Sequence, residues 1–201
     1  MRPLIAGQGK SNRAALLALV MWLAGVDEAQ ARDGVTLLLG DSIGHDYGHS
    51  IARDYLDSIT RRKTICGHPV VNAAWGGAHA IDVASRATRF IELVAPALVV
   101  VIVGANDVEW WNTAERLGAW RSYYEAIVRD ARRAGAAVIV VPIPPVKGAE
   151  PLNDGIQTLA RAWRIRVAAP TYQPGHLLDR VGHLTRSGNA VLHRAIEKAC
   201  P

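Results

Sequence analysis

Val35-Thr36-Leu37-Leu38-Leu39-Gly40-Asp41-Ser42 is an apolar run that ends abruptly in a glycine, a carboxylate and a hydroxyl. A continuous apolar run is typical of a strand that is buried on both faces of a parallel sheet. At the carboxyl end of such a strand, Ser42 would stand where open α/β sheets bind their ligands. Because Gly, Asp and Ser are also common in turns and helix N-caps, this stretch alone leaves Ser42 either a nucleophile or a helix cap.

Strand-like and helix-like patterns alternate along the rest of the chain. Further strands are predicted at 70–72, 97–103 and 137–141, with a weak fifth at 166–169. The segments between them place apolar residues at helical spacing, which predicts helices at 46–60, 79–94, 113–134, 154–164 and 187–198. This order predicts an α/β fold, a three-layer α/β/α sandwich around a five-stranded, parallel, doubly wound sheet.

The composition fits one globular domain. The chain has 201 residues, of which 50% are hydrophobic and 20% are charged, and its formal net charge is +5. This length is enough for a single hydrophobic core. The densest basic cluster, Arg61-Arg62-Lys63, is too short to indicate a nucleic-acid surface. We expect a monomer that binds no nucleic acid.

The N-terminal segment has the order of a secretory signal peptide. Arg2, Lys10 and Arg13 precede an apolar run at 14–26, and Ala29-Gln30-Ala31 follows as a small-x-small site. The run is apolar all round, which disfavours an amphipathic helix of the domain. It is also shorter than the roughly 20 residues that span a bilayer. We therefore expect a cleaved signal at 1–31, a catalytic domain at 32–201, no stable membrane anchor, and a secreted or periplasmic protein.

Cys66 and Cys200 are the two cysteines of the chain. Cys66 stands just before the predicted strand at 70–72, and Cys200 follows the predicted last helix. In an α/β fold the strands run toward the ligand-binding edge and the helices run back, so both cysteines should lie at the opposite edge. Export would permit a disulfide between them, and we expect that bridge rather than two free thiols.

Small and polar residues follow three successive predicted strands at the same edge of the sheet. A serine nucleophile needs a base, the base needs an acceptor that orients it, and the tetrahedral oxyanion needs hydrogen-bond donors. The loop before the last predicted helix adds Asp179 and His183 to this edge. Candidates for all three roles are therefore expected there. The three strand ends are Gly40-Asp41-Ser42, the segment from Asn72 to Gly77, and Gly104-Ala105-Asn106-Asp107.

These segments, taken in order, resemble the SGNH or GDSL family of serine esterases and lipases. The resemblance covers nearly the whole chain after the N-terminal segment, and it implies a flavodoxin-like sheet and a carboxylic ester hydrolase without metal or cofactor. The matching blocks are Gly40-Asp41-Ser42-Ile43, Asn72-Ala73-Ala74-Trp75-Gly76-Gly77, Gly104-Ala105-Asn106-Asp107, and Asp179 to His183 followed by Leu184, Thr185 and Gly188.

The resemblance implies a role for each matching residue. Ser42 would be the nucleophile, and His183 would be the general base that later protonates the leaving alcohol. The oxyanion would accept hydrogen bonds from the backbone N–H of Ser42, the backbone N–H of Gly77 and the side-chain amide of Asn106. Gly77 is preferred to Gly76 because it lies five residues after Asn72, as in the family block.

The last block departs from the family pattern. The family aspartate stands three residues before the histidine, but that position here is Arg180, and Asp179 stands one residue earlier. Either the loop has one extra residue and Asp179 still reaches His183, or the site is a Ser-His dyad with a backbone carbonyl as the orienting group. We expect Asp179 to complete the triad.

Two aromatic residues and three histidines stand near the predicted site. Trp110 and Trp111 follow the Asn106 loop and are candidates for substrate binding, or else for packing of that loop. His45, His49 and His79 do not have the spacing of a zinc motif, so no metal is expected. Asp41 and Asp107 are expected to hold their turns rather than to transfer protons.

Three functions are compatible with these features of the sequence. The preferred one is a secreted hydrolase that forms an acyl-enzyme on Ser42 and cleaves small acyl esters, such as acetyl esters of a carbohydrate polymer, because the predicted loops are short. A lysophospholipase or thioesterase of the same family is the second. The third is a carbohydrate-binding module with a weak site, which the irregular Asp179 spacing would indicate.

Overall fold

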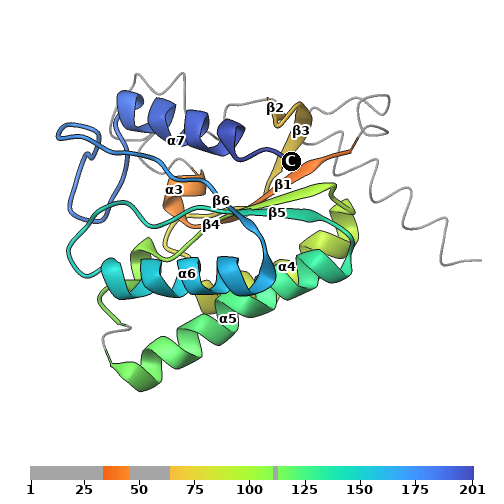
Figure 1. Cartoon of the computed structure of the whole chain (residues 1–201), viewed down its shortest axis with the longest axis horizontal. Helices are drawn as coiled ribbons and strands as arrows, with labels where there is room; N and C mark the ends of the chain where they lie inside the picture. The colour runs from red at the N-terminus through yellow and green to blue at the C-terminus, as the bar shows by residue number, and fades with distance from the viewer. Residues whose placement is uncertain (1–33, 46–63, 111–112) are drawn as a thin grey trace, which may run out of the picture.

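The computed structural model describes residues 34–45, 64–110 and 113–201. The predicted signal peptide, the predicted helix at 46–60, His49 and Trp111 lie outside the described residues. At the centre is a six-stranded sheet in the order β2-β3-β1-β4-β5-β6 (Figure 1). The strands are β1 (Thr36–Gly40), β2 (Thr64–Ile65), β3 (His68–Asn72), β4 (Leu98–Ile102), β5 (Ala137–Val140) and β6 (Arg166–Val167).

The five predicted strands pair in parallel, in the order β3-β1-β4-β5-β6. The sequence analysis missed β2, which pairs antiparallel with β3 at the edge of the sheet. Cys66 and Gly67 connect these two strands with φ angles of 53° and 77°. Two positive φ angles in a two-residue loop are typical of a hairpin turn, and the β2 strand is too short to give a periodic signal. The sheet is therefore mixed rather than fully parallel.

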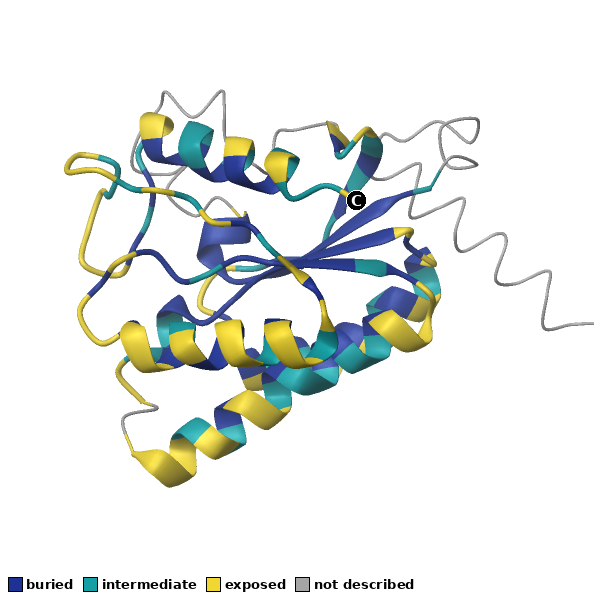
Figure 2. Ribbon diagram, in the orientation of Figure 1, coloured by how far each residue is buried: buried dark blue, intermediate teal, exposed yellow. Residues whose placement is uncertain are grey.

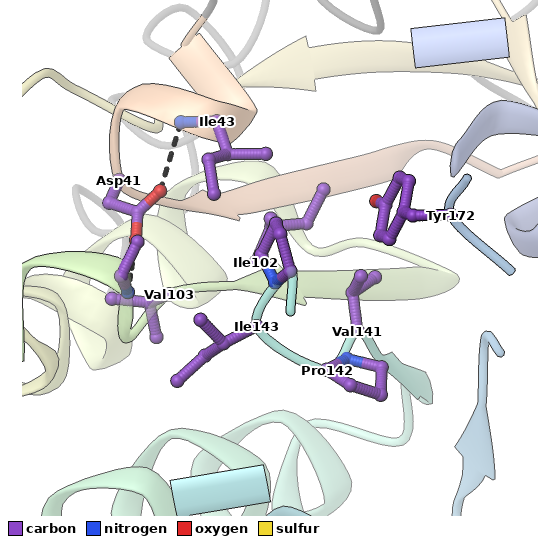
Figure 3. Close-up of a pocket in the computed structure, with 10 residues that line it drawn as sticks. Asp41, Ile43, Ile102, Val103, Val141, Pro142, Ile143 and Tyr172 are labelled. Atoms are coloured by element: carbon purple, nitrogen blue, oxygen red, sulfur yellow. Dashed lines mark hydrogen bonds between the residues drawn. The ribbon is translucent and has the colours of Figure 1, made fainter. Parts of the chain in front are cut away.

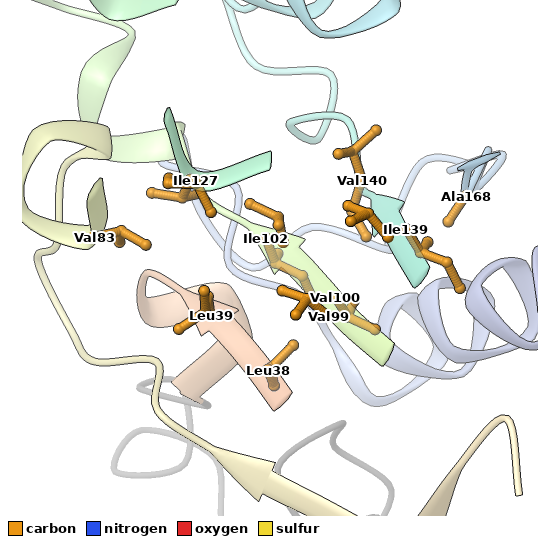
Figure 4. Packing of buried hydrophobic residues seen from close by; sticks show 14 of the residues in the cluster. Leu38, Leu39, Val83, Val99, Val100, Ile102, Ile127, Ile139, Val140 and Ala168 are labelled. Carbon is orange, nitrogen blue, oxygen red and sulfur yellow. The ribbon is translucent and has the colours of Figure 1, made fainter. Parts of the chain in front are cut away.

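β1 and β4 lie side by side in the middle of the sheet, and all of their residues are buried. Figure 4 shows Leu38 and Leu39 of β1 packed beside Val99 and Val100 of β4. Gly40 pairs with Ile102 in this register, and a Cβ at Gly40 would stand 2.1 Å from the Ile102 carbonyl oxygen. Only glycine therefore allows β1 to remain against β4 up to the residue before Asp41.

Helices cover both faces of the sheet, which makes the predicted three layers (Figure 1). Their apolar stripes face the sheet and their exposed residues face outward (Figure 2). In the part of the chain that the structure describes, no helix is both long and apolar enough to cross a bilayer. α4 (Ala80–Val94), α5 (Ala114–Arg133) and α6 (Glu150–Trp163) lie on one face, and α3 (Ser42–His45) and α7 (Arg186–Lys198) lie on the other.

The bounds of α4, α5 and α7 agree with the predicted ones to within one residue, those of α6 do not, and α3 was not predicted. Thr113 caps α5 by accepting a hydrogen bond from the Arg116 backbone N–H at 3.3 Å. α6 begins at Glu150, before the predicted start at 154, and Pro151 lies in its first turn. Proline fits there because the first N–H groups of a helix have no partner within the helix. The periodic pattern does not detect this turn, because it needs several turns to become visible.

Cys66 and Cys200 form a disulfide. The bond joins the β2–β3 turn to the end of α7, and the Cys66 backbone N–H donates to Glu197 Oε1 of the same helix at 3.2 Å. Because Cys66 precedes β3, the bond lies at the amino ends of the parallel strands, at the opposite edge of the sheet from Ser42. A bridge that closes a loop of this length stabilises a fold by about 2–5 kcal/mol.

Candidate active site

Ser42 stands two residues after the end of β1 and is the first residue of α3. The preceding residue, Asp41, is fully buried, and its two carboxylate oxygens accept hydrogen bonds from three backbone groups. Oδ1 accepts from the Ile43 N–H at 2.9 Å, which Figure 3 shows, and Oδ2 accepts from the N–H groups of Gly104 and Ala105 at 3.0 and 3.1 Å. Asp41 therefore joins the loop after β1 to the loop after β4.

Burial raises the pKa of Asp41 from 3.8 to about 6, and the neighbouring charge of Asp107 acts in the same direction, against the hydrogen bonds from Ile43, Ala105 and Gly104. Figure 3 shows Asp41 at one end of a pocket whose other lining side chains, among them Ile43, Ile102 and Val103, are mostly apolar. An ionised carboxylate loses its hydration there, and the backbone donors replace only part of it.

The loop after β3 is attached to the loop after β1 by Asn72. Its side-chain oxygen accepts from the Ala74 N–H at 2.9 Å, and its side-chain nitrogen donates to the Gly44 carbonyl at 3.0 Å. Gly77 is exposed with φ of +76°, and no protein atom lies within 4 Å of the position that a Cβ would take. A side chain at Gly77 would strain the turn and would extend into the open space in front of its N–H.

The loop after β4 contains a 3-10 turn, η3 (Ala105–Asp107), that reaches the loop after β3 through two side chains. The Asn106 side-chain amide donates to the Ala78 carbonyl at 3.0 Å. The buried Asp107 carboxylate accepts from the Ala80 N–H at 3.0 Å, and His79 Nδ1 lies 3.4 Å from its other oxygen. Asp107 therefore holds more than its own turn, because it also fixes the start of α4.

His183 lies on the far side of Ser42, in the loop between β6 and α7. Its Nε2 is 2.9 Å from Ser42 Oγ, and its Nδ1 is 2.5 Å from Asp179 Oδ2. The other oxygen, Oδ1, accepts from the backbone N–H groups of Val181, Gly182 and His183 at 3.0 to 3.1 Å. The extra residue in this loop is therefore accommodated by a tight turn around one carboxylate, and the dyad with a backbone carbonyl is not the arrangement seen.

Asp179 differs from Asp41 in its electrostatics. Its partial burial raises the pKa, but the hydrogen bonds and charge of His183, with the Val181 N–H, outweigh burial and hold the pKa below 3.8. An ionised carboxylate beside Nδ1 favours the imidazole tautomer that carries its proton on Nδ1, in which Nε2 accepts from the Ser42 hydroxyl.

A cleft of about 410 Å³ opens beside these groups. Gly77, Asn106 and Trp110 line it, and Trp110 is 64% exposed. The His79 ring meets the Trp110 ring edge-on, with centroids 6.3 Å apart. Trp110 therefore presents aromatic surface to the cleft, whereas a packing role would bury it.

The described residues contain one group with metal-ligand atoms in reach of one another, namely Cys66, Glu197 and Cys200. Its two sulfur atoms are bonded to each other and offer no thiolate. His45 and His79 do not join such a group within the described ranges.

A hydroxyl, an imidazole and a carboxylate in series, at the carboxyl edge of a parallel sheet, define the class of serine hydrolases by geometry. A sequence profile of the GDSL-like lipase/acylhydrolase family matches residues 38–192. The chain belongs to this family and is a carboxylic ester hydrolase.

Solved structures agree on the fold. A GDSL-like lipase from Bacteroides thetaiotaomicron VPI-5482 is 18% identical with a TM-score of 0.65, covering 94% of this chain and 98% of its own. A lipase/acylhydrolase from Enterococcus faecalis is 21% identical with a TM-score of 0.65, covering 82% and 94%. A catalytic mutant of an acetylxylan esterase from Geobacillus stearothermophilus is 18% identical with a TM-score of 0.64, covering 83% and 94%. No curated protein matches the sequence significantly.

Proposed function

We propose that this protein hydrolyses small acyl esters of a carbohydrate through an acyl-enzyme on Ser42. The observation that carries the proposal is the line of hydrogen-bonded groups from Ser42 Oγ to His183 Nε2 at 2.9 Å and from His183 Nδ1 to Asp179 at 2.5 Å. The alternative of a carbohydrate-binding module with a weak site rested on the spacing of Asp179. Since Asp179 contacts His183 despite that spacing, this argument for a binding module no longer applies.

In the proposed reaction, Ser42 Oγ attacks the ester carbonyl while His183 Nε2 takes its proton. The imidazolium that forms is stabilised by Asp179, and it then donates the proton to the leaving alcohol. Water enters, His183 removes a proton from it, and the acyl group leaves Ser42 as a carboxylic acid. Each half of the reaction passes through a tetrahedral oxyanion.

The oxyanion would be held by the N–H of Ser42, the N–H of Gly77 and the amide of Asn106. Two features support this assignment. Gly77 and Asn106 line one cleft, and the Asn106 amide is oriented by its bond to Ala78. Donors that are already fixed before substrate arrives stabilise the transition state without a reorganisation cost.

The residues that line the cleft favour a substrate with a small acyl group and a polar alcohol. Among its described lining residues are His79, Asn106, Glu109, Lys147 and Arg180, so it offers no continuous apolar wall for a long acyl chain. This favours the carbohydrate ester over a lysophospholipid. The exposed Trp110 supplies the flat apolar surface on which a sugar ring stacks.

Export is part of the proposal. It is supported by the charge, apolar core and small-residue site in residues 1–31, and by a disulfide of the kind that persists in oxidising compartments. Intact-mass measurement of protein recovered outside the cytoplasm should give a chain that begins at Arg32. Recovery with residues 1–31 retained would contradict this.

The test of activity is labelling by a fluorophosphonate followed by a series of p-nitrophenyl esters from acetyl to long acyl chains. We expect label on Ser42 in the wild type, none in Ser42→Ala, and turnover that falls as the acyl chain lengthens. A folded wild-type protein that takes no label would contradict the proposed function, and a preference for long chains would contradict the small acyl group.

A further inference from the structure

The cleft beside Asn106 has two walls of different character. One wall is formed by two loops that pack on each other: a Cβ at Gly182 would lie 3.3 Å from both Pro144 and Val146. Arg180 precedes Gly182 on one loop, and Lys147 follows Val146 on the other. Both side chains are exposed and line the cleft, so two cations share this wall.

The other wall is aromatic. It carries the exposed Trp110 and, edge-on to it, His79. The Trp110 carbonyl accepts a hydrogen bond from the Arg116 side chain at 3.1 Å, which holds this segment to α5. Glu109 stands next to Trp110 and is the carboxylate among the lining residues. Gly77 and Asn106 line the same cleft, and the oxyanion donors proposed there would hold the scissile ester.

Among the residues that the structure describes, no ion pair compensates the charges of the basic wall. Within the described ranges neither Lys147 nor Arg180 makes an ion pair, and Glu109 lies on the opposite segment of the cleft. A charged group with a structural role in this site looks different: the Asp107 carboxylate is fully buried and has His79 Nδ1 at 3.4 Å. Two unpaired cations beside a reactive centre instead favour a ligand with negative charge.

Arg180 is also the residue by which this chain departs from the family spacing. The extra residue leaves Asp179 bonded to His183, so it does not alter the relay. What the insertion adds is a guanidinium at the cleft wall. A guanidinium donates two parallel hydrogen bonds to a carboxylate or a phosphate, which a shorter loop with aspartate in that position could not provide.

We propose that the alcohol part of the ester is an anionic carbohydrate, with its sugar ring against Trp110 and its negative charge between Lys147 and Arg180. This inference rests on the proposed esterase function and narrows its substrate class. It makes Lys147 and Arg180 specificity-determining residues that do not touch the reacting atoms.

The test compares two forms of one polymer, O-acetylated polygalacturonate and the same material with its carboxyl groups methyl-esterified. Acetate release is measured, so that the methyl esters do not enter the signal. We expect kcat/KM to be about 5- to 20-fold higher for the charged form at low salt, since each exposed ion pair contributes roughly a 2- to 5-fold effect. Salt at about 0.5 M should remove most of this preference by screening.

Variants assign the preference to residues. Lys147→Gln and Arg180→Gln should each lower the ratio of charged to neutral kcat/KM by about 2- to 5-fold, and Glu109→Gln should raise it by about 2-fold. Lys198→Gln removes an exposed charge from the end of α7 and serves as the matched control, with the ratio unchanged. Thermal unfolding checks that each variant is folded, and the salt measurement requires no variant.

The outcomes separate the two proposals. Equal acetate release from both polymers, or a preference that neither salt nor these variants change, overturns the anionic substrate while the esterase function stands. If neither polymer releases acetate although Ser42 takes the fluorophosphonate, the proposal of an anionic carbohydrate substrate is overturned. Release from neither, with no label on Ser42, contradicts the esterase function itself.

Discussion

On one side of Ser42, the loops that carry Gly77 and Asn106 are bonded to one another by side chains from distant parts of the sequence. Asp41 reaches Gly104 across 63 positions, and Asn106 reaches Ala78 across 28. On the other side, the loop that carries His183 is held by Asp179, only four residues away, and by packing at Gly182. The proposed oxyanion side is thus fixed by hydrogen bonds between distant segments, and the base side by hydrogen bonds within its own loop and by packing on the loop after β5.

This difference matters because the two sides have different tasks. Donors to an oxyanion must stand still while charge develops on the substrate. A general base must accept a proton from one atom and deliver it to another, and a ring on a local turn can adjust slightly between them. We expect substitutions on the two sides to differ in size and in what else they change.

Removing the Ser42 hydroxyl, which lies between the two sides, should have the largest effect on kcat. Ser42→Ala deletes the nucleophile, and we expect kcat for p-nitrophenyl acetate to fall by about 10⁴-fold or more. The protein should stay folded, because Asp41 and not the Ser42 hydroxyl joins the neighbouring loops. Residual turnover within 10-fold of wild type would place the nucleophile elsewhere.

Asn106→Ala tests the oxyanion side. It removes one donor and also the bond to Ala78, so we expect kcat to fall by about 10²- to 10³-fold with KM little changed. Steady-state kinetics on an acetyl ester measures both quantities. A rise in KM with unchanged kcat would show that Asn106 binds the substrate in its ground state instead.

Asp179→Asn tests the base side, and we expect kcat to fall by about 10²-fold or more, because an amide in place of the orienting carboxylate favours the wrong imidazole tautomer. The amide keeps an acceptor for the backbone turn but loses the charge that stabilises the His183 imidazolium. The matched control is Asp154→Asn, which removes an exposed carboxylate from α6. Near wild-type hydrolysis by Asp179→Asn would mean that the site works as a dyad.

The smallest expected effect is the contribution of Asp41 to the pH dependence of the free energy of unfolding. The pKa of Asp41 is about 6 in the folded protein against 3.8 ordinarily, so the folded state binds more protons between these values. The contribution of this group to stability is therefore greatest below pH 3.8 and is lost as pH rises through 6. Between pH 5 and pH 8 we expect the loss to be about 1 to 1.5 kcal/mol.

Urea unfolding of wild type and Asp41→Asn at these two pH values measures this contribution. The variant has a neutral side chain and should lack this part of the pH dependence. It should be less stable throughout, because its amide offers one acceptor oxygen to the three backbone donors Ile43, Gly104 and Ala105. Parallel pH profiles for the two proteins would show that Asp41 does not titrate in this range.

The sequence predicted the parts of the site that are carried by strand ends. Gly40-Asp41-Ser42 and the loop at Asn106 follow buried apolar runs, and the direction and order of these strands fix where their ends lie. Asp179 and His183 were predicted from their place just before the last helix and from the resemblance of that segment to the family block. In each case the residues that matter stand next to a strong periodic signal.

The sequence did not predict the hydrogen-bond partners of side chains that can reach more than one backbone group. Asn72 was identified only as the start of a block, but its amide reaches Gly44, and Asp107 reaches Ala80 rather than holding its own turn alone. That Lys147 and Arg180 line the same cleft was also missed, because it results from packing between loops that are far apart in the chain. No local pattern encodes such contacts.

The disulfide described above has a topological consequence for durability. Because Cys66 and Cys200 are joined, the polypeptide between them is a closed covalent ring that contains Gly77, Asn106, Asp179 and His183. A protease that cuts this ring once, for instance at the exposed Lys147-Gly148 turn, opens it without releasing a fragment. Every group proposed to act on the ester therefore remains on one covalently connected molecule after a single cut.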